Sequence, residues 1–327
     1  MKITDGKFGK YATVELSNST GLTVKLCALG AGIMSIKAPD RDGASREVTK
    51  LAAGGYGAGY HGLTIGRTAG RIENARFEID GRVASLEVNN HGADNLHGGG
   101  TGFHTKAFSM KTRRGEEYTE VEFAYDSPDG EGGYFGNVAV AVTYRVYERE
   151  NKLAIRYFAR PDCKTLLNLT NHAYFNMSGD LREPVSVQDV YINASRVGVL
   201  DERLIVRDIA KVAPQFDFRT PHKMGEYVKD ESVQRHTCGY DHPFFLDARG
   251  TDSVACSLYS ALSGIKMQVR TTYPCLVVFG DNFEGYMSTC FETEYHPDGV
   301  HQCPDDCGIC TPDEPYDNTT EFEFSIA

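Results

Sequence analysis

The sequence lacks the features that mark membrane, secreted and nucleic-acid-binding proteins. No stretch reaches the roughly 18 consecutive apolar residues that a membrane-spanning helix needs. The N-terminal lysines have no apolar run behind them, so they do not resemble a secretory signal. Acidic residues (45) outnumber basic ones (34), the formal net charge is −11, and no basic block occurs. Because clustered Lys and Arg bind phosphate backbones, we expect a cytoplasmic protein that binds neither nucleic acid nor membrane.

Tryptophan is also absent, and no long polar linker or break in composition divides the chain. The 327 residues are therefore expected to form a single domain, 1–327, around a core that the 41% hydrophobic residues can fill. A glycine run, 98–100, follows His97 but lacks the strand and helix that flank a nucleotide-binding loop. The acidic balance favours a neutral small molecule over a strongly anionic one as the ligand.

Nine cysteines, an odd number, are spread over the chain, and in a reducing compartment most should remain thiols. Cys303, Cys307 and Cys310 cluster near the C-terminus, after His296 and His301. Thiolates and imidazoles are the ligands of structural zinc, so this cluster is a candidate metal site. Its spacing does not match the paired pattern of zinc-binding cysteines. We therefore favour an ordinary surface loop and expect no metal.

Alternation of apolar and polar residues with a period of two dominates the chain and indicates half-buried β-strands. Residues 138–146 and 153–157 alternate on either side of a polar turn and predict a long hairpin. Asp80-Gly81 favours a tight hairpin turn. No apolar stripe of helical period reaches the roughly 12 residues of a typical helix, and only a short helical turn is expected near 231–235. The fold class is therefore all-β, a large antiparallel sandwich or barrel.

Several polar segments interrupt this pattern and carry groups that bind or titrate. Their notable residues are Arg67 and Arg71; His91, His97 and His104; Asn168, Asn171 and His172; Asp241; and Glu292 and Glu294. Each has an ordinary structural explanation, such as an ion-paired arginine, an asparagine at a strand end or a solvated glutamate. These residue types are also suited to ligand binding or proton transfer. Arginine offers a fork of donors to hydroxyls or carboxylates, and histidine is the natural proton donor near neutral pH.

Taken in order, these segments resemble the motifs of the galactose mutarotase (aldose 1-epimerase) family over nearly the whole chain. The matching segments are LGAGIMSIKAPDRDG, GRTAGRI, NNHGADNLHGGGTGF, NLTNHAYFNMSG, FDFRTP, GYDHPFFL and CFETEYHPDGVHQ. The resemblance implies a galactose mutarotase-like β-sandwich with an open, polar substrate cleft. It also implies an isomerase that interconverts the α and β anomers of a free aldohexose, such as galactose or glucose, in carbohydrate metabolism.

By residue-wise match, the resemblance implies that His172 is the general acid and Glu292 the general base. It implies roles in holding the sugar for Arg71, His97 and Asp241, and places Phe279, in a looser match, along the cleft. It implies no metal and no organic cofactor. The expected partner is a small-molecule sugar, and the protein is expected to be a monomer or a homodimer.

The chain departs from the family pattern at a few positions. Gly70 stands where the family often has Asn, Glu294 where it usually has Gln, and His301 where it has Asn, and the cysteine-rich tail is atypical. These changes bear on sugar preference more than on the reaction. Glu292 and Glu294 are two apart in a strand-like segment and so share a face. If they lie close together, the basicity of one of the pair is raised.

Three other functions compete with this prediction. A glycoside hydrolase uses two carboxylates, for which Glu292 and Asp241 are candidates, but the His172 motif has no role there. A non-catalytic carbohydrate-binding protein would not need an acid and base pair. A relative of the hexose-phosphate epimerases would need a basic pocket, which the sequence does not reveal.

Overall fold

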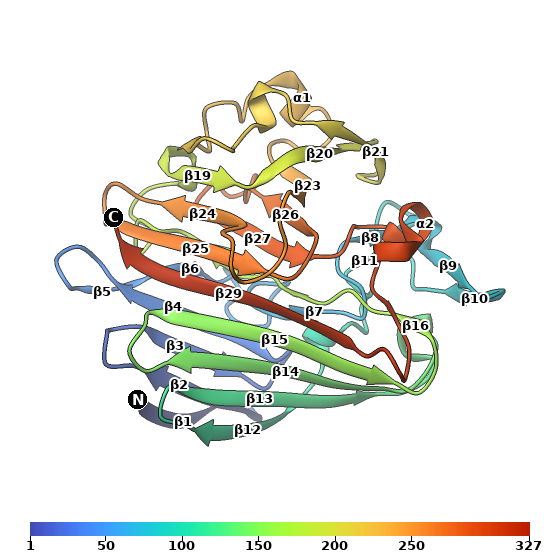
Figure 1. Ribbon diagram of the computed structural model, residues 1–327, viewed down its shortest axis with the longest axis horizontal. Coiled ribbons are helices and arrows are strands. Elements are labelled where there is room, and N and C mark those ends of the chain that lie inside the picture. Colours follow the sequence, from blue (N-terminus) through green and yellow to red (C-terminus); the bar gives the residue numbers. More distant parts are fainter.

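A computed structural model describes residues 1–327, and nearly all of its regular structure is β-strand (Figure 1). Its two α-helices, α1 (Glu231–Gln234) and α2 (Gly299–Gln302), have four residues each. The all-β prediction is confirmed, and α1 lies where a short helical turn was expected. No helix has the length and apolar character needed to cross a membrane.

The largest sheet has nine strands, and every neighbouring pair in it is antiparallel. In spatial order its strands are β12 (Ser109–Arg114), β13 (Tyr118–Ser127), β14 (Val138–Tyr147), β15 (Lys152–Pro161), β29 (Tyr316–Ile326), β25 (Ile265–Thr271), β24 (Cys256–Tyr259), β19 (Asp189–Ile192) and β22 (His222–Lys223). The predicted hairpin is β14 and β15, and the burial of alternate residues along β29 follows the same period of two.

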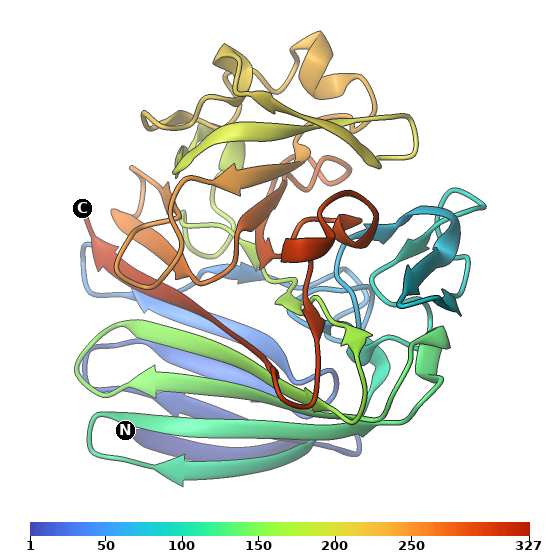
Figure 2. The same cartoon turned by 45° about the vertical axis from the view of Figure 1, so that its right-hand side comes forward.

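Two further antiparallel sheets face this one. A seven-stranded sheet has the order β21 (Val206–Lys211), β20 (Ala194–Leu200), β23 (Asp241–Leu246), β26 (Cys275–Phe279), β27 (Thr289–Glu294), β18 (Tyr174–Phe175) and β6 (Thr49–Lys50). A five-stranded sheet has β1 (Lys2–Phe8), β2 (Tyr11–Ser17), β3 (Thr23–Cys27), β4 (Gly32–Pro39) and β5 (Ser45–Glu47), and Figure 2 shows it behind β12–β15. One cluster of 56 buried residues draws side chains from all three sheets, which forms the core of the sandwich.

Short strand pairs tie the connecting loops together at one end of the sandwich. They are β7 (Thr64–Ile65) with β17 (Thr170–Asn171), β8 (Arg71–Ile72) with β11 (Asn95–Leu96), β9 (Arg76–Ile79) with β10 (Arg82–Ser85), and β16 (Thr165–Leu166) with β28 (Ile309–Cys310). Six 3₁₀ turns complete the structure: Glu73–Ala75, Phe103–Thr105, Glu131–Gly133, Val185–Val187, Pro214–Phe216 and Pro304–Asp306. Asp80 and Gly81, both with positive φ, form the tight β9–β10 turn that their sequence predicts.

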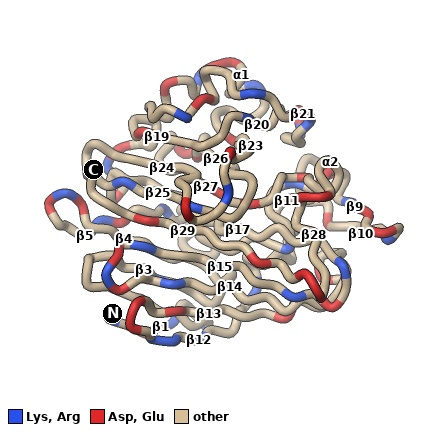
Figure 3. The backbone as a smooth tube through the Cα atoms, viewed as in Figure 1, with Lys and Arg blue, Asp and Glu red and all other residues tan.

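Charged side chains of both signs are interspersed along the chain, and Figure 3 shows no block of Lys and Arg. One arginine has a structural task inside the protein. Arg67 is 2% exposed, and its guanidinium donates to Ser127 Oγ and to the carbonyls of Ser127, Pro128, Phe135 and Gly136. The planar fork of donors therefore holds the loop between β13 and β14, which is the structural alternative that the sequence allowed for this residue.

Replacing Arg67 with Lys should lower the free energy of unfolding by about 2–4 kcal/mol, because one ammonium cannot satisfy this set of buried carbonyls. Urea unfolding followed by circular dichroism measures the change. Arg76, an exposed residue of β9, offers the matched control Arg76→Lys. A loss no larger than that of the control would contradict a structural role for Arg67.

Candidate active site

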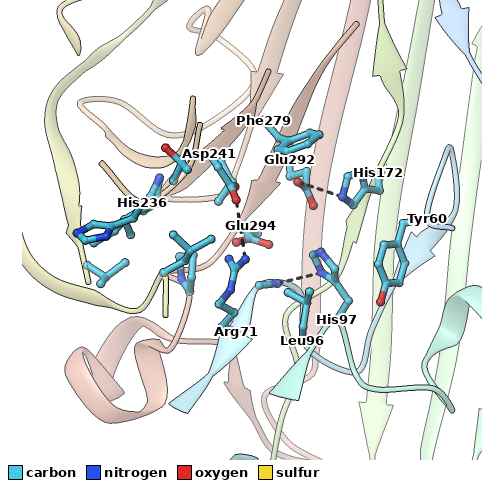
Figure 4. Close-up of a pocket in the computed structure, with 18 of the residues that line it drawn as sticks. Tyr60, Arg71, Leu96, His97, His172, His236, Asp241, Phe279, Glu292 and Glu294 are labelled. Atoms are coloured by element: carbon cyan, nitrogen blue, oxygen red, sulfur yellow. Dashed lines mark hydrogen bonds and ion pairs between the residues drawn. The ribbon is translucent and has the colours of Figure 1, made fainter. Parts of the chain in front are cut away.

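The loops and strand ends at one end of the seven-stranded sheet enclose a pocket of about 470 Å³. All six residues that the family resemblance singled out line this pocket, and Figure 4 shows their side chains converging. Asp241 begins β23, Phe279 ends β26 and Glu292 lies on β27, whereas Arg71 is on β8 and His97 and His172 follow β11 and β17. Residues from six separate segments of the chain therefore meet in one place.

The centre of the pocket is a close pair formed by His172 and Glu292. His172 Nε2 lies 3.5 Å from Glu292 Oε1, and the two residues are only 5% and 4% exposed. Pairing of β18 with β27 places Tyr174 opposite Cys290 and thereby brings the segment that carries His172 beside the strand that carries Glu292. Backbone hydrogen bonds of His172 with Leu63 and Gly62 hold the same segment from its other side.

Aromatic rings and backbone hydrogen bonds fix the orientation of His172. Tyr174 and Tyr60 stack near its ring, with centroids 5.1 and 5.8 Å away. Its Nδ1 lies 3.4 Å from Cys290 Sγ, and its backbone N–H donates to the Leu63 carbonyl. Nε2 is therefore the nitrogen presented to Glu292 and the pocket.

Burial disfavours the charged form of each member of the pair. It lowers the pKa of His172 to about 3. It raises the pKa of Glu292 to about 8, helped by the negative charge of Asp241 and opposed by Arg71. At neutral pH the pair therefore holds one proton, and burial places it on Glu292, because the neutral arrangement is favoured over the separated charges.

Polar groups surround this pair on the opposite side of the pocket. Arg71 Nη2 lies 3.8 Å from Asp241 Oδ2, and Arg71 Nε donates to Asn90 Oδ1 over 3.1 Å. His97 Nδ1 accepts from the Gly70 amide at 3.3 Å, so Nε2 is the donor of its neutral ring. Burial also lowers the pKa of His97, which keeps that ring neutral. This side of the pocket offers both donors and acceptors to a ligand rich in hydroxyl groups.

Two asparagines that the sequence marked near His172 have structural tasks. Asn168 accepts from the Tyr295 amide at 2.8 Å, directly after β27, and Asn171 donates to the Gly62 carbonyl at 2.8 Å. Both side chains tie loops to the strands that carry the catalytic candidates. They are therefore positioning groups, which the strand-end interpretation of the sequence allowed.

Some pocket residues lie outside the motifs used to predict the site. Tyr60 and His236 line the pocket from outside these motifs, whereas Tyr174 and His91 line it from within two of them. Tyr60 follows a glycine-rich, polar run, which was a weak signal for a loop near the site. No sequence signal pointed to His236, because it adjoins α1 in a region without a distinctive motif. Glu294 also lines the pocket, which confirms that it shares a face of β27 with Glu292.

The histidines and cysteines differ in their capacity to bind metal. His97, His172 and Glu292 each offer a ligand atom, and these atoms lie within 4.8 Å of one another. No such group forms around the C-terminal cysteines: Cys307 packs in a cluster of ten buried residues, and Cys310 belongs to the main core. The expected surface loop is thus wrong for these two thiols, because apolar packing buries them.

Comparisons with known proteins agree over almost the full length. A family model described as aldose 1-epimerase matches residues 12–323. The aldose 1-epimerase of Escherichia coli is 32% identical, covering 96% of this chain and 95% of its own length, and the galactose mutarotase of Homo sapiens is 32% identical, covering 94% and 92%. A solved galactose 1-epimerase from Lactobacillus acidophilus is 24% identical with a TM-score of 0.85, covering 100% of this chain and 98% of its own. An aldose epimerase homologue from C. elegans is 25% identical with a TM-score of 0.84, covering 99% and 100%.

Replacing Asp241 with Asn should lower the pKa of Glu292 below about 8, because the Asp241 charge helps to hold it up. A ¹³C NMR titration of glutamate-labelled protein measures this, and the Glu292→Gln spectrum identifies the resonance. Asp208→Asn, at an exposed position on β21, serves as the control. An unchanged or higher pKa of Glu292 in the Asp241 variant would contradict the electrostatic account of the pocket.

Proposed function

The chain belongs to the aldose 1-epimerase family and is an isomerase, and we propose that it interconverts the α and β anomers of free aldohexoses such as galactose or glucose. Glu292 is the general base and His172 the general acid of this proposal. The observation that carries it is the buried pair, with 3.5 Å between Nε2 and Oε1, that shares one proton inside a polar pocket.

Anomer exchange needs one proton to leave the C1 hydroxyl and one to reach the ring oxygen. Glu292 takes the proton from O1 while His172 delivers one to O5, so the C1–O5 bond breaks, its electron pair stays on O5, and O1 becomes a carbonyl oxygen. The aldehyde then rotates about the C1–C2 bond. Ring closure reverses both transfers: His172 takes the proton back as O5 attacks the other face of C1, and Glu292 returns its proton to O1.

The proton count of the pair suits this cycle. In the free enzyme the proton is on Glu292 and both groups are neutral. Ring opening starts from the arrangement in which the proton has moved to His172 and Glu292 is ionised, and it ends with the proton back on Glu292. Burial opposes both charges of the starting arrangement, so the pair favours the transfer that opens the ring. Each positioned acid or base contributes about 10²–10⁴-fold to the rate.

The remaining side chains hold the sugar while C1 stays mobile. Arg71 and His97 Nε2 donate to hydroxyls or to the ring oxygen, and the Asp241 carboxylate accepts from hydroxyls. Phe279 contributes an apolar face to the pocket. No metal or organic cofactor takes part in the proposed cycle.

The residues that line the pocket disfavour the competing functions. Arg71 is the only Lys or Arg that lines it, and Asp241, Glu292 and Glu294 line it too, which disfavours a sugar phosphate. A glycoside hydrolase would pair two carboxylates across the bond, whereas the close partner of Glu292 is an imidazole. A binding module would have no use for a buried pair that shares a proton.

We extend the proposal to the domain organisation, the cellular compartment and the metabolic role of the enzyme. The core of 56 residues that unites the sheets supports a single domain over residues 1–327. All nine cysteines are free thiols, which supports a reducing compartment and hence the cytoplasm. A role in carbohydrate metabolism, galactose use included, follows from the proposed substrates.

Replacing Glu292 or His172 with Gln should lower kcat for mutarotation by about 10²–10⁴-fold, because each change removes one proton-transfer group. Polarimetry of freshly dissolved α-D-galactose and α-D-glucose measures the rate above the buffer blank. Glu321→Gln, on β29 outside the pocket, is the matched control, and circular dichroism checks the fold. Turnover near the wild-type value in either variant would refute the assignment.

The pH profile of kcat/KM should be flat at neutral pH and fall as pH rises through about 8. Above that pH Glu292 has lost its proton while His172 is already neutral, so the pair holds no proton to deliver. The acid limb, where both groups are protonated and no base remains, lies near pH 3. Initial rates corrected for buffer catalysis at each pH give the profile. A limb that rises through pH 8 would contradict the shared-proton account.

A further inference from the structure

Glu294 is a buried carboxyl group for which the protein provides no partner. Its residue is 1% exposed, and neither side-chain oxygen accepts or donates a hydrogen bond. It lies two residues beyond Glu292 on β27 and lines the same pocket, where Figure 4 shows it between Arg71 and Glu292. The proposed proton transfer does not use it.

Leaving such a group unpartnered is costly, because burial removes its water and returns no hydrogen bond. The nearby cation does not neutralise it: Arg71 forms its ion pair with Asp241 and donates to Asn90. The free energy of folding therefore gains nothing from Glu294. A buried carboxyl group that destabilises the fold and faces a ligand pocket is better explained by a role in ligand binding than by a role in folding.

The backbone of Gly70 lies close to the carboxyl group of Glu294. A Cβ atom at Gly70 would lie 3.2 Å from Glu294 Oε1 and 3.0 Å from Pro297 Cβ, so a side chain there would crowd the carboxyl group. Gly70 has a φ of +68°, which suits glycine. The glycine at position 70 and the glutamate at position 294 are two of the departures from the family pattern noted in the sequence, and they are neighbours in space.

The surroundings of Glu294 favour its neutral form. Burial raises its pKa, and the charges of Glu292 and Asp241 raise it further, while Arg71 opposes them. A neutral carboxylic acid has one O–H donor and one carbonyl acceptor. That combination matches a sugar hydroxyl, which also donates one hydrogen bond and accepts others.

We propose that Glu294 binds a hydroxyl group of the sugar ring away from C1 and thereby helps to set which aldohexose the enzyme prefers. The inference rests on the proposed function, in which Glu292 acts at O1. Two residues along a strand span about 7 Å, so Glu294 faces a hydroxyl on a different ring carbon from the one that Glu292 contacts.

The test compares Glu294→Met, which is close in shape but apolar, with Glu294→Gln, which keeps hydrogen-bonding groups. The exposed Glu78→Met on β9 is the matched control. Mutarotation kinetics are measured for galactose, glucose and the 2-, 3-, 4- and 6-deoxy forms of galactose. Glu294→Met should raise KM for the parent sugar about 3–10-fold, with a smaller change in kcat, and Glu294→Gln should raise it less.

Two further results should accompany the higher KM of Glu294→Met. For one deoxy sugar, the one that lacks the hydroxyl bound by Glu294, wild type and Glu294→Met should have the same KM. The midpoint of thermal unfolding of Glu294→Met should rise by about 1–3 °C, because the variant removes an unpartnered buried carboxyl group. Better stability with weaker binding is the signature of a binding residue and not of a structural one.

Equal losses for every sugar, or a lower unfolding midpoint in Glu294→Met, would overturn the proposed role. KM values in Glu294→Met that match those of Glu78→Met for all the sugars would overturn it as well. The wild-type enzyme separates this failure from that of the proposed function. If wild type accelerates no aldose above the buffer blank, the mutarotase proposal itself fails, whatever the variants do.

Discussion

The antiparallel register between β18 and β27 is the constraint on which the site depends. Pairing of Tyr174 with Cys290 brings the segment that carries His172 beside β27, where its imidazole lies 3.5 Å from the buried carboxyl group of Glu292. Only residues 172 and 173 separate β17 from β18, so the strand pairings on both sides hold His172 in place. Burial lowers the pKa of His172 and raises that of Glu292, so both neutral forms are favoured. In the proposed cycle the pair then passes one proton through a bound sugar in either direction.

The same sheet arranges the rest of the pocket around this pair. Pairing of β23 with β26 places Asp241 beside Phe279, and pairing of β26 with β27 places Phe279 beside Cys290. The period of two along β27 puts Glu294 on the same face as Glu292 and turns Thr293 away to Thr320. Arg71 lies on β8 and His97 directly follows β11, and the β8–β11 pairing ties these two segments together.

The sequence alone predicted the strands well, because alternation reports directly on half-buried β-structure. The β14–β15 hairpin, the turn at Asp80-Gly81 and the short α1 helix were all found from local pattern. Local pattern could not predict that the site residues converge in one pocket. His172 and Glu292 are far apart in the chain, and two-residue strands such as β17 and β18 are too short to show a period, so spacing could not pair them. Only the order of motifs, taken as a family resemblance, indicated which residues belong together. The burial of Cys307 and Cys310 was missed because an Asp- and Pro-rich segment resembles an exposed loop.

In the proposed cycle the His172–Glu292 pair opens and closes the sugar ring at the C1–O5 bond without breaking the C1–O1 bond. Galactose labelled with ¹⁸O at C1 tests this directly, because the isotope shifts the ¹³C NMR signal of C1 in each anomer. The enzyme should bring the α and β anomers to equilibrium faster than buffer does while the label stays on C1. Loss of the label to water in step with anomer exchange would show cleavage at the C1–O1 bond and contradict it.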